Sequence, residues 1–499
     1  MWRAYDPLQA PSGHMADATT TDTYVGSASA LAVALAAVGG AAVGARVVAA
    51  TGGRVVVPAL VIAVVLRLHA HRSTSPGTAR DRARLASVVV LVATAAFLRA
   101  GAEWRDVSDV EFGPWRGWAT VESDPAPRGS AMVVVVRLDE KRFETWAYGR
   151  HRSSAGSLEA GDLVWLAGTT SAIGDATARR RSAVRHVVGR VRLEFIADIR
   201  DGSPGAVAAN RVRGMLRSSA ERSMDARHAA LFTGLVIGDD ARQDPSMVEE
   251  FRDAGLSHLT AVSGQNVAFV LLAAGPLLRR LSPWARWSST LALIAGFAAV
   301  ARGEPSVLRA GVMAALSATA FTVGRPVSPL RLLGLAVSGL VLVDPFLVHS
   351  VGFWLSVGAT AGVCALAPVI ERRLPGPNWL TMPLSLTIAA QAGVAIPALV
   401  VFGRLPAVAL LANPAASAVA GFVMLAGIPS ATASAMASEL GAPSIGDALM
   451  WPVAVGTRWV ADVAGVAAAL PLPAASSIAA WTALAAWLAL RRPRTPVPF

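Results

Sequence analysis

The second half of the chain is a succession of apolar segments joined by short polar connections. Nine segments follow His258, at 259–278, 287–301, 306–324, 330–349, 351–370, 380–403, 405–431, 447–470 and 474–490. Apolar runs of about twenty residues are long enough for α-helices that cross a bilayer. Charged residues make up only 16% of the chain, whereas a soluble protein carries about 25%. The sequence therefore predicts a polytopic α-helical membrane protein.

Three earlier apolar runs, at 28–45, 55–68 and 85–98, raise the prediction to about twelve transmembrane helices. Cytoplasmic connections are rich in arginine and lysine. A basic loop precedes the third run, and four later connections on the same predicted side carry ten arginines in all. The opposite connections carry only Arg302 and Arg404. This asymmetry predicts a cytoplasmic C-terminus.

The stretch from 103 to 203 has a different character, with dense charges of both signs and short alternating runs. Five runs predict β-strands, at 117–123, 131–139, 143–149, 162–168 and 183–198. Five short strands suit a small barrel of the OB type. The third membrane helix crosses outward, so we expect this all-β domain to be external, inserted after that helix.

Five aromatic residues fall within the predicted β domain: Trp115, Trp118, Trp146, Tyr148 and Trp165. Such residues stack on nucleic-acid bases in some barrels of this kind. They also fill the cores of small barrels, and we expect core positions here because the balanced charge disfavours a strong phosphate-binding groove.

The predicted regions follow from these patterns. They are a polar N-terminal tail (1–27), N-terminal membrane helices (28–102), the external β domain (103–203), amphipathic interfacial helices (204–257), a membrane domain (258–490) and a basic cytoplasmic tail (491–499). An amphipathic helix over 204–240 carries several arginines. It is expected to lie along the membrane surface, with a basic collar at a pore mouth as the alternative.

The first segment of the membrane domain is interrupted by polar residues. HLTAVSGQNVAF begins at His258 and places Ser263, Gly264, Gln265 and Asn266 inside an apolar run. Polar groups at membrane depth are tolerated only where they face protein or water. The interruption therefore predicts a binding site or a conduction path, and His258 lies at its entrance.

Two further places put polar side chains inside the membrane domain. In ARGEPSVLRAGVM, Arg309 is predicted about one turn inside the bilayer, with Glu304 as a candidate partner despite a poor spacing. A structural ion pair between Arg309 and Glu304 and a role of these residues in a pore fit the sequence equally well. In LLANPAAS, Asn413 precedes Pro414 and predicts a helix break, whose freed backbone groups would bind an ion or merely permit a kink.

Signatures of known catalytic sites are missing from the sequence. There is no phosphate loop, no His-Glu-x-x-His and no GxSxG elbow. Cys364 is the only cysteine, which excludes an intrachain disulfide. We therefore expect no enzyme activity, no cofactor and no metal site.

Four motifs resemble the ComEC competence family, whose members pass single-stranded DNA into the bacterial cytoplasm during transformation. They occur in the family's order between Leu231 and Gly421: GLVIGDD with FRDAGLSHLTAVSGQNVAF, EPSVLRAGVMA, DPFLVHSVGFWLSVGAT and VFGRLPAVALLANPAAS. The first of them is highly specific. The family's N-terminal domain, reported as OB-like, also fits the predicted β domain.

Two departures from the family's pattern matter. The family often has S-G-L-H-V where this chain has Ser263 to Val267 without histidine, so no histidine can act there. Many members also carry a C-terminal metallo-β-lactamase-like domain thought to degrade the non-transported strand. This sequence ends at Phe499 without an HxHxDH motif, so we expect no nuclease activity in it.

The resemblance implies a channel for single-stranded DNA in the lipid bilayer of the bacterial inner membrane. The expected path residues are His258, Ser263, Gly264, Gln265, Asn266, Glu304, Arg309 and Asn413. The implied partners are a DNA receptor protein, a cytoplasmic ATPase or helicase that drives transport, and a separately encoded nuclease. A transporter or channel for another solute, in a host that is not competent, fits the interrupted helices equally well on physical grounds. A membrane-embedded hydrolase is the weakest hypothesis.

Overall fold

The structure is a computed structural model, and it describes residues 29–44, 78–260, 263–325, 327–403, 407–470 and 474–491. Four predicted regions lie wholly or mostly outside the described residues: the tail at 1–27, the tail at 491–499 after its first residue, the apolar run at 55–68 and most of the basic loop that follows it. The chain forms two compact units. The first takes its described residues from 1–109, 274–287 and 312–350, and the second from 110–273, 288–311 and 351–499.

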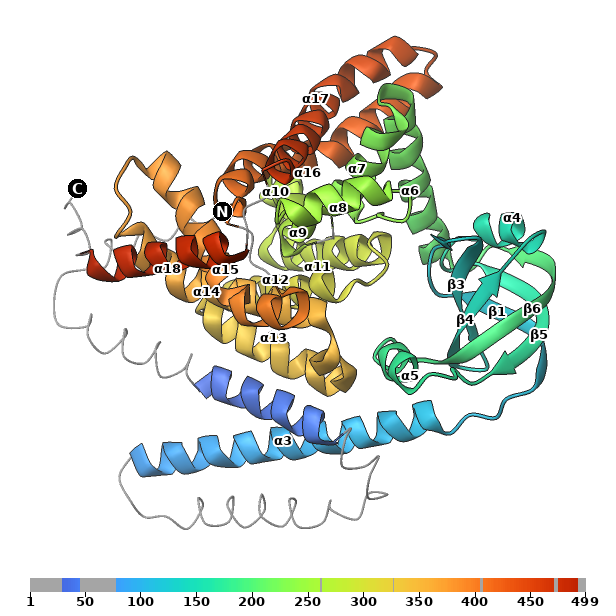
Figure 1. The fold of residues 1–499 in the computed structure, drawn as a ribbon, viewed down its shortest axis with the longest axis horizontal. Helices are drawn as coiled ribbons and strands as arrows, with labels where there is room; N and C mark the ends of the chain where they lie inside the picture. Colours follow the sequence, from blue (N-terminus) through green and yellow to red (C-terminus); the bar gives the residue numbers. More distant parts are fainter. Residues whose placement is uncertain are drawn as a thin grey trace. The chain divides into compact units, whose positions relative to one another are not determined.

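The β domain lies in the second unit and contains the five predicted strands together with a short sixth (Figure 1). The strands are β1 Pro114–Val121, β2 Ala126–Arg128, β3 Ala131–Leu138, β4 Lys141–Ala147, β5 Leu163–Ser171 and β6 Val187–Arg200. Two short helices, α4 His151–Gly156 and α5 Ala176–Ala183, join them.

The sheet closes into a small barrel. Its strand order is β1-β5-β6-β4-β3-β2, and β1 also pairs with β3. Only β4 and β6 run parallel among the described strands. The interior is filled by aliphatic side chains from alternate strand positions, such as Val134, Val136 and Leu166. The predicted barrel is therefore present.

Four helices follow the barrel: α6 Pro204–Ser223, α7 Ala226–Ile237, α8 Pro245–Asp253 and α9 Ser257–Thr260. The prediction of one amphipathic helix over 204–240 was wrong, because the helix ends at Ser223 and a new one starts after Asp225. The Asp225 side chain accepts a hydrogen bond from the His228 N–H, which is a typical N-cap. Every residue of α7 from Ala229 to Ile237 is buried, so α7 packs inside the protein instead of lying on a surface.

Nine helices among the described residues coincide with the nine apolar segments predicted after His258. They are α10 Gly264–Leu278, α11 Pro283–Val300, α12 Pro305–Thr322, α13 Pro329–Val343, α14 Val351–Glu371, α15 Asn378–Phe402, α16 Ala409–Glu439, α17 Pro443–Ala468 and α18 Ala474–Leu490. Four of them begin at a proline, which lacks the N–H that a first helical position leaves unpaired.

Three of these helices, α14, α15 and α16, are long and apolar enough to cross a membrane, as judged over the described residues. Shorter apolar helices include α10, α13 and the helix at Ser29–Gly44. The structure therefore supports a membrane protein with a small barrel, while the total of about twelve transmembrane helices stays a prediction.

Glycines allow close packing of helices in both units. In the second unit α14 packs along α15, and a side chain at Gly362 or Gly393 would run into the backbone of the facing helix. In the first unit Gly40 and Gly44, on the helix at Ser29–Gly44, meet the backbone of α3 Thr78–Ser108 in the same way. Small residues at such contacts are typical of helix packing in membranes.

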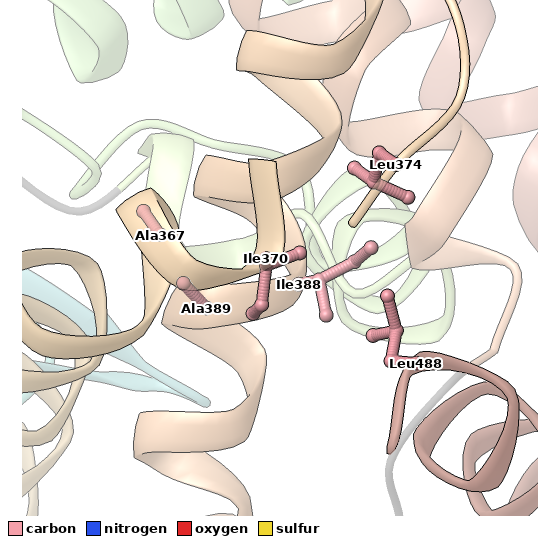
Figure 2. Close-up of a cluster of buried hydrophobic side chains, with 6 residues drawn as sticks. All are labelled: Ala367, Ile370, Leu374, Ile388, Ala389 and Leu488. Carbon is pink, nitrogen blue, oxygen red and sulfur yellow. The ribbon is translucent and has the colours of Figure 1, made fainter. Parts of the chain in front are cut away.

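A cluster of aliphatic side chains lies where α14, α15 and α18 meet (Figure 2). Its buried members are Ala367, Ile370, Leu374, Ile388, Ala389 and Leu488. The cluster joins the last described helix to the α14–α15 pair.

Candidate functional site

The interrupted segment folds as two helices with Ser263 between them. The short helix α9 ends at Thr260, and α10 begins at Gly264. The Ser263 Oγ accepts a hydrogen bond from the Gln265 N–H at 3.3 Å, and the Asn266 Oδ1 accepts one from the Ser263 N–H at 3.2 Å. This reciprocal arrangement is a capping box. The polar residues of the motif therefore cap the N-terminus of α10.

Asn266 is almost completely buried, with 2% of its surface exposed. Its Nδ2 donates to the carbonyl oxygens of Leu235 at 2.6 Å and Val236 at 3.1 Å. Both carbonyls lie in the last turn of α7, where helix carbonyls have no intrahelical donor. Asn266 thus joins the end of α7 to the start of α10, while the side chain of the neighbouring Gln265 is exposed.

Arg309 lies in the second turn of α12 and is 3% exposed. Its Nη2 lies 3.8 Å from the position that a Cβ on Gly264 would occupy, and that Cβ would lie 3.0 Å from the Cβ of Ala310. Its Nε and Nη1 have no hydrogen-bond partner among the described residues. The structure therefore brings Arg309 to the first turn of α10.

Glu304 is not the partner of Arg309, because no ion pair joins them among the described residues. Glu304 lies in the connection before α12, near Asp240 and Arg185. Burial raises the pKa of the Glu304 carboxyl. The negative charge of Asp240 raises this pKa further, by a smaller amount, and the positive charge of Arg185 lowers it. The poor spacing along the helix explains why the predicted pair does not form.

His258 and Asn413 form a second polar group. The His258 side chain is exposed, and it lies beside the Asn413 amide. Asn413 itself is 7% exposed, and its Oδ1 accepts a hydrogen bond from the Ser417 Oγ at 3.3 Å. The predicted helix break at Asn413 was wrong: α16 continues through Pro414. Neighbouring helices can stabilise a proline inside a membrane helix.

An ion-pair network that the sequence did not reveal connects the barrel to the helices of the same unit. Asp124 in the barrel accepts from Arg213 of α6 at 2.8 Å and from Arg302 at 2.6 Å. Arg213 also lies 3.3 Å from Asp239, which pairs with Arg217 at 2.9 Å. Asp124 and Arg302 are far apart in sequence, so no local pattern signals the contact.

The charge state of Asp124 follows from this network. Burial by itself would raise the pKa of the carboxyl. The hydrogen bond from Arg302 and the positive charges of Arg213 and Arg302 outweigh burial and hold the pKa below its ordinary value. Burial lowers the pKa of Arg213, but an arginine stays charged at any physiological pH.

The barrel aromatics are not core residues, so the expectation of core positions was wrong. Trp118 is 40% exposed and Tyr148 54% exposed. Trp115, Trp146 and Trp165 are half-buried. The aliphatic residues already fill the small interior, which leaves the large rings outside.

Arginines accompany these outer rings. The guanidinium of Arg200 lies over the ring of Trp118, 4.2 Å from its centre, and Arg190 lies 5.3 Å over Trp146. Trp118 on β1 is directly opposite Trp165 on β5, whose ring contacts Phe195. We call Trp118, Trp165, Phe195 and Arg200 the aromatic face. It is an exposed surface of rings with a cation, suited to flat anionic ligands.

Comparison with known proteins identifies a family for the chain. The family model described as competence protein matches residues 235–494, just over half of the chain. The uncharacterized protein YcaI of Escherichia coli (strain K12) is 28% identical over 164 residues, which is 31% of this chain. The chain matches only 21% of the length of YcaI. No solved structure matches the chain. On the strength of the family match, this chain belongs to the competence protein family.

Proposed function

We propose that this protein is an inner-membrane channel that passes single-stranded DNA into the cytoplasm during DNA uptake. The observation that carries the proposal is the aromatic face, where exposed rings lie beside an arginine. Bases of any sequence stack on such rings, and arginine adds attraction for the backbone. Membership of the competence protein family supports a role in DNA uptake.

In this proposal the barrel is an external domain of the OB type, in keeping with its closed sheet. The strand then enters the helical domain near His258 and passes the Ser263–Asn266 turn. The driving force comes from a separate ATPase or helicase. A DNA receptor and a separately encoded nuclease act before the channel, and the C-terminus is cytoplasmic.

The first experiment measures binding of a fluorescent oligothymidylate to the full chain in detergent micelles. Trp118→Ala should weaken binding about 5- to 160-fold, because stacking of one base contributes about 1–3 kcal/mol. Arg200→Ala should weaken binding and reduce its salt dependence. Trp284→Ala is a matched control, since Trp284 is an exposed tryptophan of α11 outside the barrel.

The alternative, a transporter of another solute, predicts a different result. In that case Trp118→Ala and Trp284→Ala would bind DNA equally weakly. In a transformable host, the proposal also requires that deletion of the gene lowers entry of labelled DNA. Uptake equal to that of the wild-type strain would reject the proposed function.

A further inference from the structure

The buried guanidinium of Arg309 has no counter-charge in the described part of the chain. Its Nε and Nη1 donate to no described residue, and no described carboxylate forms an ion pair with it. Arg309 nevertheless has 3% exposure. A buried cation without a partner is costly, and breaking such a pair in other proteins costs about 3–5 kcal/mol. A ligand that completed the pair would remove this cost.

The surroundings of Arg309 make the unpaired charge more costly. The guanidinium lies against Gly264, the first residue of the 15-residue helix α10. The N-terminus of a helix carries about half a positive charge. Positive charge therefore gathers at one buried point, and it favours an anion there.

Gly264 permits this close approach. A Cβ at Gly264 would lie 3.0 Å from the Cβ of Ala310 and 3.8 Å from the Arg309 Nη2. Without a side chain, the first turn of α10 can lie beside the guanidinium. The Ser263 and Asn266 side chains hold that turn in place.

We propose that Arg309 and the first turn of α10 form a binding site for a phosphate-class oxyanion. A guanidinium binds phosphate in proteins, and the positive end of a helix favours an anion. The Gln265 and Asn266 N–H groups of α10 already donate to Ser263, so the unpaired guanidinium of Arg309 supplies the hydrogen bonds. The identity of the phosphate rests on the proposed function: the ligand is a phosphodiester of the passing strand. Each phosphate of the strand binds at this site in turn as the strand passes through the helical domain.

The test uses the full chain in maltoside micelles, which contain no phosphate, and inorganic phosphate as the probe. Equilibrium dialysis with labelled phosphate measures binding, and thermal unfolding is compared in phosphate and in chloride of equal ionic strength. The wild type should bind phosphate and unfold at a higher temperature in phosphate. Arg309→Gln should lose the temperature shift and weaken binding at least tenfold.

Two other variants keep the result interpretable. Arg252→Gln removes an exposed arginine of α8 and should bind phosphate like the wild type. Arg309→Lys retains the charge, so it tests the site if the glutamine variant does not fold, and it should bind phosphate about tenfold more weakly. Absence of binding by the wild type, or equal binding by the wild type and both Arg309 variants, would overturn the site.

Competition identifies the source of the phosphate. An oligothymidylate of eight nucleotides should displace labelled phosphate, whereas its uncharged methylphosphonate analogue should not. Displacement by phosphatidylglycerol alone would overturn the assignment to the strand. If the wild type bound phosphate but no oligothymidylate, the proposed function would be rejected and the oxyanion site would stand.

Discussion

Asn266 should be the most sensitive residue of the family motif, although it touches no solvent. Replacing it by alanine removes the acceptor of the Ser263 N–H and both donors to the carbonyls of Leu235 and Val236. Loss of an N-cap interaction costs about 1 kcal/mol. Buried carbonyls left without donors cost about 1–3 kcal/mol. Asn266→Ala should therefore lower the free energy of unfolding by about 2–4 kcal/mol.

The assay is reversible unfolding of the full chain in mixed micelles, followed by circular dichroism. Asn266→Asp separates the two contributions, because aspartate keeps the acceptor but loses both donors. Its negative charge at the start of α10 is favourable by about 0.3–1 kcal/mol, yet it faces the two carbonyls of α7. This variant should remain destabilised relative to the wild type.

Gln265→Ala provides the matched control. Gln265 is the preceding residue and its side chain is exposed, so the change should stay within about 0.5 kcal/mol. If Asn266→Ala were as stable as Gln265→Ala, Asn266 would not join α7 to α10, and the arrangement described for the site would be wrong.

Three other perturbations test separate parts of the structure. Asp124→Asn should lower the free energy of unfolding by about 1.5–3 kcal/mol, because the buried Arg213 loses one of its two carboxylate partners and keeps Asp239; a urea titration of both proteins checks this. The folded-state pKa of Asp124 is depressed, so its stabilisation is complete above about pH 4 and is lost as the pH falls through the folded-state value; wild type and Asp124→Asn should therefore converge in stability only in strong acid, and a constant gap down to pH 2 would contradict this. Gly393→Ala should destabilise the α14–α15 pair by about 1–3 kcal/mol, since a Cβ there clashes with the facing backbone. Gly296 lies within α11 in open space, so Gly296→Ala should leave stability unchanged or raise it by up to about 1 kcal/mol; equal melting temperatures of the two variants would refute the close packing.

The sequence predicted the positions of helices and strands well because these depend on local patterns. Apolar runs located α11, α12 and α13, and alternation located the barrel strands. The sequence did not predict contacts between residues that are distant along the chain. Asp124 meets Arg302 only after the barrel and helices have folded together.

The functional residues show the same division. The start of α10 at Ser263 and Gly264 follows from local polar chemistry, and the structure confirms a helix break there. The packing of α12 against α10 decides that Arg309 lies beside Gly264 and does not pair with Glu304. The role of Trp118 depends on how much aliphatic volume fills the barrel. Such questions of volume and packing have no signature along a single sequence.

Passage of DNA across a membrane is the central claim, and reconstitution tests it most directly. The full chain is inserted into liposomes, labelled single-stranded DNA is added outside, and the fraction that survives external nuclease is measured over time. The account predicts more protected strand than in protein-free liposomes, little protection of the same sequence as a duplex, and reduced protection with Trp118→Ala. Equal protection with and without the protein, at matched DNA concentration, would contradict the account.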